Sequence, residues 1–560
     1  MTRPANLTRW LVSSVGGPND LQAATTCRPV GESHPRTIPS TEGSELMRTT
    51  TQTAAGLLGL ALLSPMTTAS AAAETCRGEA ATIVGTGPTI TGTEGRDVVV
   101  TNGATDIDTL GGDDLVCVVP SSGDEWVPTR VDVDAGPGDD VVDTSAGRPT
   151  PGVFTVVLGV GADTYVGGGG QDEVTTGNRT DLVDDDTDTV RTGDFYDRVI
   201  TGAQNGASHD VVDTGSDSDV IQLTSTSFGA DAVLAAGEGD DVLQVEIASG
   251  DVSFDMAPGV MRTTAGNATF SSVDEVALNT HSNGTVTYAG TRSDDVLGIH
   301  PRGATPTLDV ATKGGADEIV IEPADISAAS RIEAGSGRDE LVAASHTGRL
   351  ALHLKKDQLE IDDTSVVADS MEHALLMAPQ VKLVGDRADN LLGYVGCEAT
   401  MRGGAGRDEL YGTSDNDFHR YRFDCLETAT MNGGSGADRL FGGPGADRLS
   451  GGSGRDSLRG RNSSDVLRGG KGHDTLYGHA DDDDLRGGKG PDRLWGHGGE
   501  DDLRGGMDDD RLWGGGEDDD LRGNMGNDRL LAGKGHDRAD GGPGRRDRCR
   551  AAERVRRCER

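Results

Sequence analysis

Near its carboxyl end the chain places an aspartate at every ninth residue, twelve times in succession without a slip. The first unit, residues 433–441, reads GGSGADRLF, and a leucine stands two residues after each aspartate until Ala539 takes that place in the last unit. A nine-residue unit is too short to bury a core by itself, so such units must stack on one another. The aspartates are Asp438, Asp447, Asp456, Asp465, Asp474, Asp483, Asp492, Asp501, Asp510, Asp519, Asp528 and Asp537.

Each unit divides into a glycine-rich turn and a strand of about three residues. Glycine allows the positive φ angles and the close backbone approach that tight turns need. Side chains of a strand alternate between its two faces, so the leucine points inward and its two neighbours point outward. The repeat therefore predicts an all-β solenoid.

The outward residues show that the true period is 18, because they alternate between consecutive units. The residue three places after the aspartate is aromatic or apolar in one set and arginine in the other: Tyr477, Trp495, Trp513 and Leu531 against Arg468, Arg486, Arg504 and Arg522. The residue before the leucine alternates as well: Arg493, Arg511 and Arg529 against Asp484, Asp502 and Asp520. We therefore expect two strands in each coil and two chemically distinct faces, as in a flattened parallel β-roll.

The composition excludes a set of ordinary globular domains. Of 560 residues, 84 are glycine, only 3% are aromatic and 34% are hydrophobic, and the formal net charge is −42. A chain with this much charge and so few apolar residues stays disordered unless its charge is neutralised.

Stacking would place the aspartates of successive coils about 4.8 Å apart in two files. Neighbouring carboxylates at that distance repel by roughly 1 kcal/mol in bulk water and by about 3–4 kcal/mol at an effective dielectric constant of 20. A hard divalent cation between the turns removes this repulsion and can also bind the turn carbonyls. Calcium suits such a site, since it accepts six to eight oxygens in flexible geometry, whereas magnesium requires tight octahedra. No clustered cysteine or histidine set suggests zinc.

Residues 433–542 resemble the RTX (hemolysin-type) family of calcium-binding repeats. The resemblance implies that each ion is held by sixth-position aspartates of turns one coil apart and by backbone carbonyls of the glycine turn. Six turns in each file leave five gaps, so up to ten calcium ions are expected. Besides the twelve aspartates, the expected ligands are Gly433, Ser435, Gly442, Pro444, Gly451 and Ser453.

Some units depart from the pattern of the family. The fourth-position glycine is replaced by Ser463, Asp481, Asp508 and Glu517, and the second-position glycine by Arg461, His479, His497 and Asn524. The last turn has one extra residue, so Asp547 stands ten residues after Asp537. These departures put the corresponding sites in doubt.

Upstream, residues 74–432 carry the same turn-then-strand units at irregular spacing, for example around Asp113, Asp139, Asp240, Asp317 and Asp408. We expect a right-handed parallel β-helix of degenerate coils, continuous with the regular roll of 433–542, and a basic cap over 543–560. Calcium sites among the upstream aspartates cannot be assigned from irregular spacing.

The amino-terminal segment is expected to be a targeting sequence. Residues 47–73 contain an apolar run over 54–63 and an alanine-rich end, which is typical of a secretory signal peptide. Residues 1–46 are predicted to be a non-structural leader, with Met47 as the true start. The apolar run is too short to span a membrane. Six cysteines follow it, and an exported chain favours three local disulfides, Cys76–Cys117, Cys397–Cys425 and Cys549–Cys558.

These features favour a secreted calcium-binding protein that folds on binding and has a structural or adhesive role. The chain lacks the His-Glu-x-x-His and Gly-x-Ser-x-Gly patterns, so we expect no enzyme. The alternative is a β-helix enzyme acting on extracellular polysaccharide. The acidic charge disfavours nucleic acid. The Arg/Trp face, for example Arg493 and Trp495, is expected to bind a glycan or cell-surface partner or, in the structural alternative, to hold the sheet together by cation–π packing.

Overall fold

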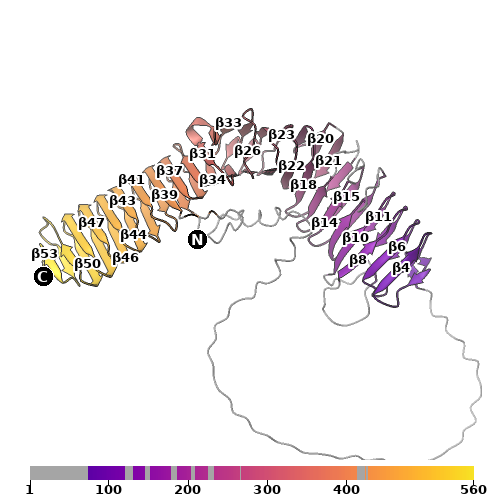
Figure 1. The fold of residues 1–560 in the computed structure, drawn as a ribbon, viewed down its shortest axis with the longest axis horizontal. Helices are drawn as coiled ribbons and strands as arrows, with labels where there is room; N and C mark the ends of the chain where they lie inside the picture. The colour runs from indigo at the N-terminus through magenta and orange to yellow at the C-terminus, as the bar shows by residue number, and fades with distance from the viewer. Residues whose placement is uncertain are drawn as a thin grey trace, which may run out of the picture. The chain divides into compact units, whose positions relative to one another are not determined.

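The computed structural model describes residues 74–119, 130–145, 152–177, 186–202, 209–224, 232–264, 266–412, 423, 425 and 427–559. This part of the chain is a parallel β-solenoid of about 20 turns, which confirms the predicted fold class (Figure 1). Its only helical element is the 3-10 turn η1 (Leu354–Lys356). No helix in the described ranges has the length and apolar character needed to cross a bilayer. The predicted leader (1–46) and signal peptide (47–73) lie outside the described residues.

Two parallel ladders of strands form the solenoid, and the chain alternates between them. Sheet I consists of β4 (Thr89–Thr93), β6 (Asp106–Leu110), β8 (Arg130–Asp134), β10 (Val153–Val157), β12 (Gln171–Thr175), β14 (Arg198–Thr201), β16 (Val220–Leu223), β18 (Val242–Ile247), β22 (Glu275–Thr280), β24 (Val296–Pro301), β27 (Glu318–Ile321), β30 (Glu340–Ala344), β34 (His373–Met377), β36 (Leu391–Val395), β38 (Glu409–Gly412), β40 (Arg439–Phe441), β42 (Ser457–Arg461), β44 (Thr475–Ala480), β46 (Arg493–Gly498), β48 (Arg511–Gly516), β50 (Arg529–Lys534) and β52 (Arg548–Arg550).

Sheet II faces the opposite way and takes the alternate strands. It consists of β3 (Ile83–Val84), β5 (Val98–Val100), β7 (Leu115–Cys117), β9 (Val141–Asp143), β11 (Thr164–Val166), β13 (Thr189–Gly193), β15 (Val211–Gly215), β17 (Ala232–Ala235), β21 (Asn267–Ser271), β23 (Thr285–Ala289), β25 (Thr307–Ala311), β28 (Arg331–Glu333), β33 (Thr364–Asp369), β35 (Gln380–Val384), β37 (Glu398–Ala405), β39 (Thr428–Ser435), β41 (Arg448–Gly454), β43 (Val466–Gly472), β45 (Asp484–Lys489), β47 (Asp502–Met507), β49 (Asp520–Met525), β51 (Arg538–Asp540) and β53 (Arg554–Arg556).

Two antiparallel insertions interrupt the alternation in the upstream part. Strand β20 (Val260–Thr263) pairs antiparallel with both β19 (Val252–Asp255) and β21, and β32 (Gln358–Ile361) pairs antiparallel with both β31 (Arg349–His353) and β33. Strands β19 and β31 also pair parallel with β23 and β35. Two short pairs complete the described part: β1 (Thr75–Cys76) with β2 (Glu79–Ala80), and β26 (Gly314–Gly315) with β29 (Ser336–Gly337). The insertions explain why the sequence spacing is irregular here although the coils stack regularly.

In the roll the register is 18 residues, as predicted, so that Leu476 pairs with Leu494 and Tyr477 with Trp495. The strands are longer than the three residues expected, because parallel pairing continues into the glycine turns, where Gly452 pairs with Gly470. The two sheets carry the two sets of outward residues that the alternation predicted.

One core runs through all the coils between the two sheets. Its inward residues are valine, isoleucine, leucine and a few larger side chains upstream, and almost only leucine in the roll. The roll leucines from Leu440 to Leu530 are at most 2% exposed. A core only one side chain thick needs few aromatics, which accounts for the composition.

All three predicted disulfides are present. They join Cys76 to Cys117, Cys397 to Cys425 and Cys549 to Cys558, with Cα separations of 5.5, 5.6 and 5.8 Å. The last one requires the basic tail to bend: Cys549 lies on β52 of sheet I, and the chain passes through β53 of sheet II before it reaches Cys558. The first and the last coil are therefore each held by a covalent link.

Candidate metal sites in the turns

The twelve sixth-position aspartates lie in two files, one in the turns that lead into each sheet. All twelve are buried, with exposures of 0–3%. Within a file, Oδ1 of each aspartate accepts a hydrogen bond from the backbone N–H of the aspartate one coil earlier, except that the donor to Asp447 is Ala429. The donor–acceptor distance is 2.9 Å from Asp456 to Asp474 and 2.8 Å from Asp474 to Asp492. One carboxylate oxygen of each residue therefore holds successive coils together.

The second carboxylate oxygen is the unsatisfied group. In eleven of the twelve aspartates, all except Asp447, Oδ2 is buried and has no hydrogen-bond partner. In ten of these eleven turns it points back at the glycine that begins the turn, while Ala532 begins the turn of Asp537. A Cβ on Gly469, for example, would lie 2.5 Å from Oδ2 of Asp474 and 2.7 Å from the carbonyl oxygen of Gly487, one coil on. We call this meeting of Oδ2, the first-position backbone and the next first-position carbonyl a turn site. It gathers oxygen ligands only, the kind that calcium prefers.

Burial makes the charged form of these carboxylates unfavourable. It raises the pKa of Asp456 and Asp492 to about 7 and that of Asp510 to about 9, and neighbouring aspartates of the same file add to the effect. A buried carboxylate oxygen without a donor is costly. Either a proton or a cation must therefore compensate each file.

The turns have the same backbone conformation where another residue replaces glycine. In the regular turns the second and fourth residues have positive φ, for example 107° at Gly452 and 139° at Gly454. The non-glycine residues at these two positions also have positive φ, between 68° and 92°, namely Arg461, Ser463, His479, Asp481, His497, Asp508, Glu517 and Asn524. The departures from the family pattern that put these turns in doubt leave their conformation intact.

One turn differs from the others. Oδ2 of Asp447 accepts a hydrogen bond from the backbone N–H of Gly443 at 2.6 Å, and the carbonyl of Pro444 accepts one from the hydroxyl of Ser463 at 2.9 Å. Its carboxylate is therefore satisfied without a cation. Among the other expected carbonyl ligands, that of Ser435 accepts from Gly406 at 3.0 Å and that of Ser453 from Gly436 at 2.8 Å. Each of these carbonyls keeps a second lone pair.

The files extend beyond the regular repeat at both ends. Oδ1 of Asp547 accepts from Asp528 at 2.9 Å, so the extra residue in the last turn does not break the sheet I file. Oε2 of Glu553 takes the corresponding place for Asp537 in the other file. Upstream, Asp408 and Asn390 continue the sheet I file. The sequence analysis missed Asn390 and Glu553 because neither is an aspartate.

The same carboxylate-to-amide chains run through the irregular coils. In sheet II they link Asp97, Asp114, Asp140, Asp163, Asp188 and Asp210, and in sheet I they link Asp172, Asp197, Asp219, Asp241 and Asp274, then Asp295, Asp317, Asp339 and Glu372. These files could not be read from the spacing, since their sequence steps vary from 17 to 33 residues with loops and insertions.

Four upstream turns differ from the roll at the first position, whereas others, such as those that begin at Gly167 and Gly403, have glycine there as the roll does. Threonine stands there in Thr109, Thr192, Thr214 and Thr312, and its hydroxyl donates a hydrogen bond to the first-position carbonyl of the next coil. The distances are 2.9 Å from Thr192 to Thr214 and 2.8 Å from Thr214 to Ala236. Threonine thus occupies the place that glycine leaves open in the roll. Burial raises the pKa of Asp197 and Asp219 to about 8, which favours the neutral form of these two side chains beside the threonines.

The outward face of sheet I carries a row of stacked aromatic rings, Tyr477, Trp495 and Trp513, which we call the aromatic file. The rings of Tyr477 and Trp495 are stacked at 4.8 Å and those of Trp495 and Trp513 at 4.4 Å, with interplanar angles of 12° and 1°. Cation–π contacts are formed by Arg459, which lies 5.4 Å from the ring of Phe441 and 5.5 Å from that of Tyr477, and not by the arginines beside the tryptophans for which they were expected. The tryptophan rings cover each other's faces.

No group of three or more His, Cys, Asp or Glu side chains within reach of one metal ion occurs in the described part of the chain. A cation at a turn site would therefore depend on one or two carboxylates together with backbone carbonyls. This donor set fits calcium and does not fit zinc.

The fold and these turns define a class: a parallel β-solenoid whose turns repeat one oxygen-lined site. The family model that describes four copies of the RTX calcium-binding nonapeptide repeat matches the chain in five segments, residues 400–418, 429–458, 459–494, 477–512 and 513–545. The carboxy-terminal coils are therefore RTX-type calcium-binding repeats. No curated protein matches the chain.

Proposed function

We propose that this chain is a secreted structural or adhesive protein whose roll folds when calcium binds at the turn sites. The observation that carries the proposal is the row of buried, partnerless Oδ2 atoms aimed at first-position glycines. A cation there would compensate the carboxylates and link adjacent coils. Because the core of the roll is a single file of leucines, metal binding would supply much of its folding free energy.

The number of ions follows from the turn geometry. Five gaps separate the six aspartates that the regular repeat gives each file, so the regular repeat has ten turn sites at most. Because Asp447 already has a donor for Oδ2, we expect nine. Turns with threonine in the first position are expected to stay free of calcium.

Calcium titration of the mature chain, residues 74–560, tests this proposal. We expect a metal-free protein with reduced β signal in circular dichroism and a cooperative gain at calcium concentrations of about 10⁻⁴–10⁻³ M, the range common in extracellular modules. Elemental analysis after equilibration should find about nine calcium ions per chain. A protein with the same spectrum in chelator and in calcium, and without bound metal, would refute the proposal.

A second role, binding of a glycan or cell-surface partner, is favoured by the outward face of sheet I. Arg493, Arg511 and Arg529 lie there in a row, and none of them has a side-chain hydrogen bond or ion pair within the described ranges. The proposed role is non-catalytic. The alternative, an enzyme acting on extracellular polysaccharide, predicts the release of new chain ends from such polymers, which a reducing-end assay would detect.

A further inference from the structure

The strands of sheet I from β40 to β52 contain no acidic residue. Their outward positions hold basic side chains in register, so that Arg493 pairs with Arg511, Arg511 with Arg529, and Arg529 with Arg548. Parallel pairing sets neighbouring arginines about 4.8 Å apart at the backbone. These four arginines form a file of like charge, which we call the arginine file.

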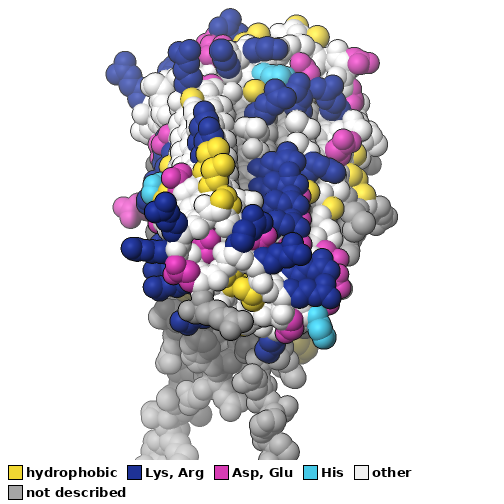
Figure 2. All heavy atoms as spheres, turned by 90° about the vertical axis from the view of Figure 1, so that its left-hand side faces the viewer, with side chains coloured by type: hydrophobic (Ala, Val, Ile, Leu, Met, Phe, Trp, Pro, Cys, Tyr) yellow, Lys and Arg dark blue, Asp and Glu magenta, His cyan; other side chains and the backbone are white. Residues whose placement is uncertain are grey.

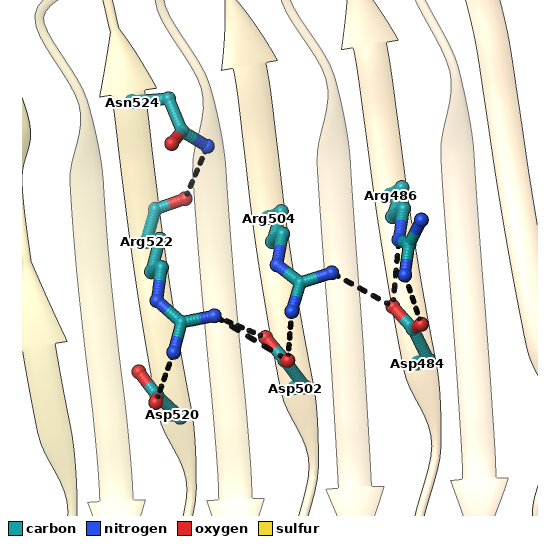
Figure 3. A network of polar contacts seen from close by, with 7 residues as sticks. All are labelled: Asp484, Arg486, Asp502, Arg504, Asp520, Arg522 and Asn524. Carbon is teal, nitrogen blue, oxygen red and sulfur yellow. Dashed lines mark hydrogen bonds and ion pairs between the residues drawn. The ribbon is translucent and has the colours of Figure 1, made fainter.

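Sheet II shows what a neutralised arginine row looks like in the same roll. There Arg486, Arg504 and Arg522 alternate with Asp484, Asp502 and Asp520 (Figure 3). Arg522 binds Asp520 on its own strand and Asp502 on the neighbouring strand, the latter at 3.1 Å. Each of these three guanidinium groups therefore has a carboxylate partner, whereas no ion pair is found for any member of the arginine file in the described ranges.

Calcium would change the charge of this region. Residues 433–542 contain 23 acidic and 16 basic side chains, and twelve of the acids are the buried sixth-position aspartates. With those compensated by calcium, 11 acids face 16 bases, and the tail from 543 to 560 adds eight arginines against three acids. Figure 2 shows Lys and Arg side chains gathered in rows on this end of the molecule. The loaded roll is therefore a basic surface on an otherwise acidic chain.

The aromatic file narrows the choice of ligand. Bases or sugars that stack on proteins need open ring faces, but Trp495 and Trp513 are stacked on each other. The rings thus stiffen the face and leave recognition to the guanidinium groups. Arginine binds carboxylate and sulfate groups through paired hydrogen bonds. A polymer with anionic groups at regular intervals matches a file of arginines, whereas single-stranded nucleic acid loses the stacking on which it relies.

We propose that the calcium-loaded roll binds an acidic polysaccharide along the outward face of sheet I, with the arginine file as the contact. This inference rests on the proposed calcium function and names the partner class for its adhesive role. The polymer lies across the strands and supplies the ion-pair partners that the arginine file does not have in the described ranges, where Asp509 is a nearby charge for Arg529 without an ion pair to it.

The test uses the calcium-loaded mature chain, dextran sulfate as the probe and uncharged dextran as its neutral counterpart. We expect binding of dextran sulfate alone, and at least a tenfold weaker affinity for the triple variant Arg493→Gln/Arg511→Gln/Arg529→Gln. The control is Arg486→Gln/Arg504→Gln/Arg522→Gln, which removes the same charge from the other face and should change affinity less than threefold. Circular dichroism and calcium stoichiometry are measured on every sample.

Each other outcome overturns the inference. Equal loss in both triple variants would mean diffuse attraction without a site. Binding of poly-dT as tight as that of dextran sulfate would assign the face to nucleic acid. Equal binding in chelator would remove the role of calcium in exposing the basic surface. Absence of dextran sulfate binding by a chain that has bound calcium refutes this inference alone, whereas absence of bound calcium refutes the proposed function.

Discussion

Replacing one file aspartate by asparagine should change stability in opposite directions with and without calcium. We choose Asp474→Asn, because an amide oxygen can still accept the 2.9 Å hydrogen bond that the backbone N–H of Asp456 donates. Burial raises the pKa of Asp474 to about 6, roughly two units above its ordinary value, which corresponds to about 3 kcal/mol of destabilisation at pH 8. Without metal, the variant should therefore be more stable than the native chain by up to about 3 kcal/mol.

With calcium the sign reverses. A site with calcium at 100 times its Kd contributes about 2.7 kcal/mol, and Asp474 adjoins the gaps to Asp456 and to Asp492. Loss of both sites costs about 5 kcal/mol, and the gain of up to about 3 kcal/mol from removing the buried carboxylate offsets part of this cost, so the variant should then be less stable by at least about 2 kcal/mol. Urea unfolding at pH 8, followed by the fluorescence of Trp495 and Trp513, measures both values.

The exposed Asp309→Asn is the control for loss of one charge, and it should change neither value by more than about 0.5 kcal/mol. If Asp474→Asn were destabilising by the same amount in chelator and in calcium, its carboxylate would have only a packing role and the cation argument would be wrong.

Three further predictions follow from the same turns. The metal-free roll should be more stable at pH 5 than at pH 8.5, because carboxylates whose folded-state pKa is raised to about 6–9 bind protons on folding and this stabilisation is lost as the pH rises through those values; equal urea midpoints at the two pH values would contradict this. Gly469→Ala should lower the calcium stoichiometry and lower the free energy of unfolding in calcium by several kcal/mol, because its Cβ would lie 2.5 Å from Oδ2 of Asp474. The control Gly498→Ala, whose Cβ would have its nearest neighbour at 3.7 Å, should be nearly neutral, and similar urea curves for both variants would count against the turn sites. Thr192→Gly/Thr214→Gly should add calcium to the amino-terminal coils, which elemental analysis would detect, and unchanged metal content would show that the hydroxyls do not decide where calcium binds.

Much of the fold could be predicted from the sequence because the roll repeats without interruption. Eleven equal intervals gave the two sheets, the inward leucines and the two outward faces, and the six cysteines after residue 73 gave the three disulfides. The files also follow from that spacing, since equivalent residues of a parallel ladder must stack.

The upstream files could not be predicted, because loops and two antiparallel insertions change the number of residues per coil while the hydrogen bonds between coils stay the same. The role of the first position was present in the sequence but was missed. Thr192 stands five residues before Asp197, as Gly469 does before Asp474, and only the hydroxyl-to-carbonyl bond shows what the difference does. The satisfied carboxylate of Asp447 was equally hidden, since it depends on a local turn around Pro444.

The carboxylate-to-amide bonds have a direction. Oδ1 always accepts from the coil nearer the amino terminus, so any partly formed solenoid ends in a bare N–H group that only the next coil can satisfy. Coils can therefore be added one at a time from the amino terminus, and the carboxylate of each added coil finds an unpaired N–H donor on the coil before it. A chain that leaves a cell amino terminus first would thus assemble in the order in which it emerges, with no need to wait for its last residue.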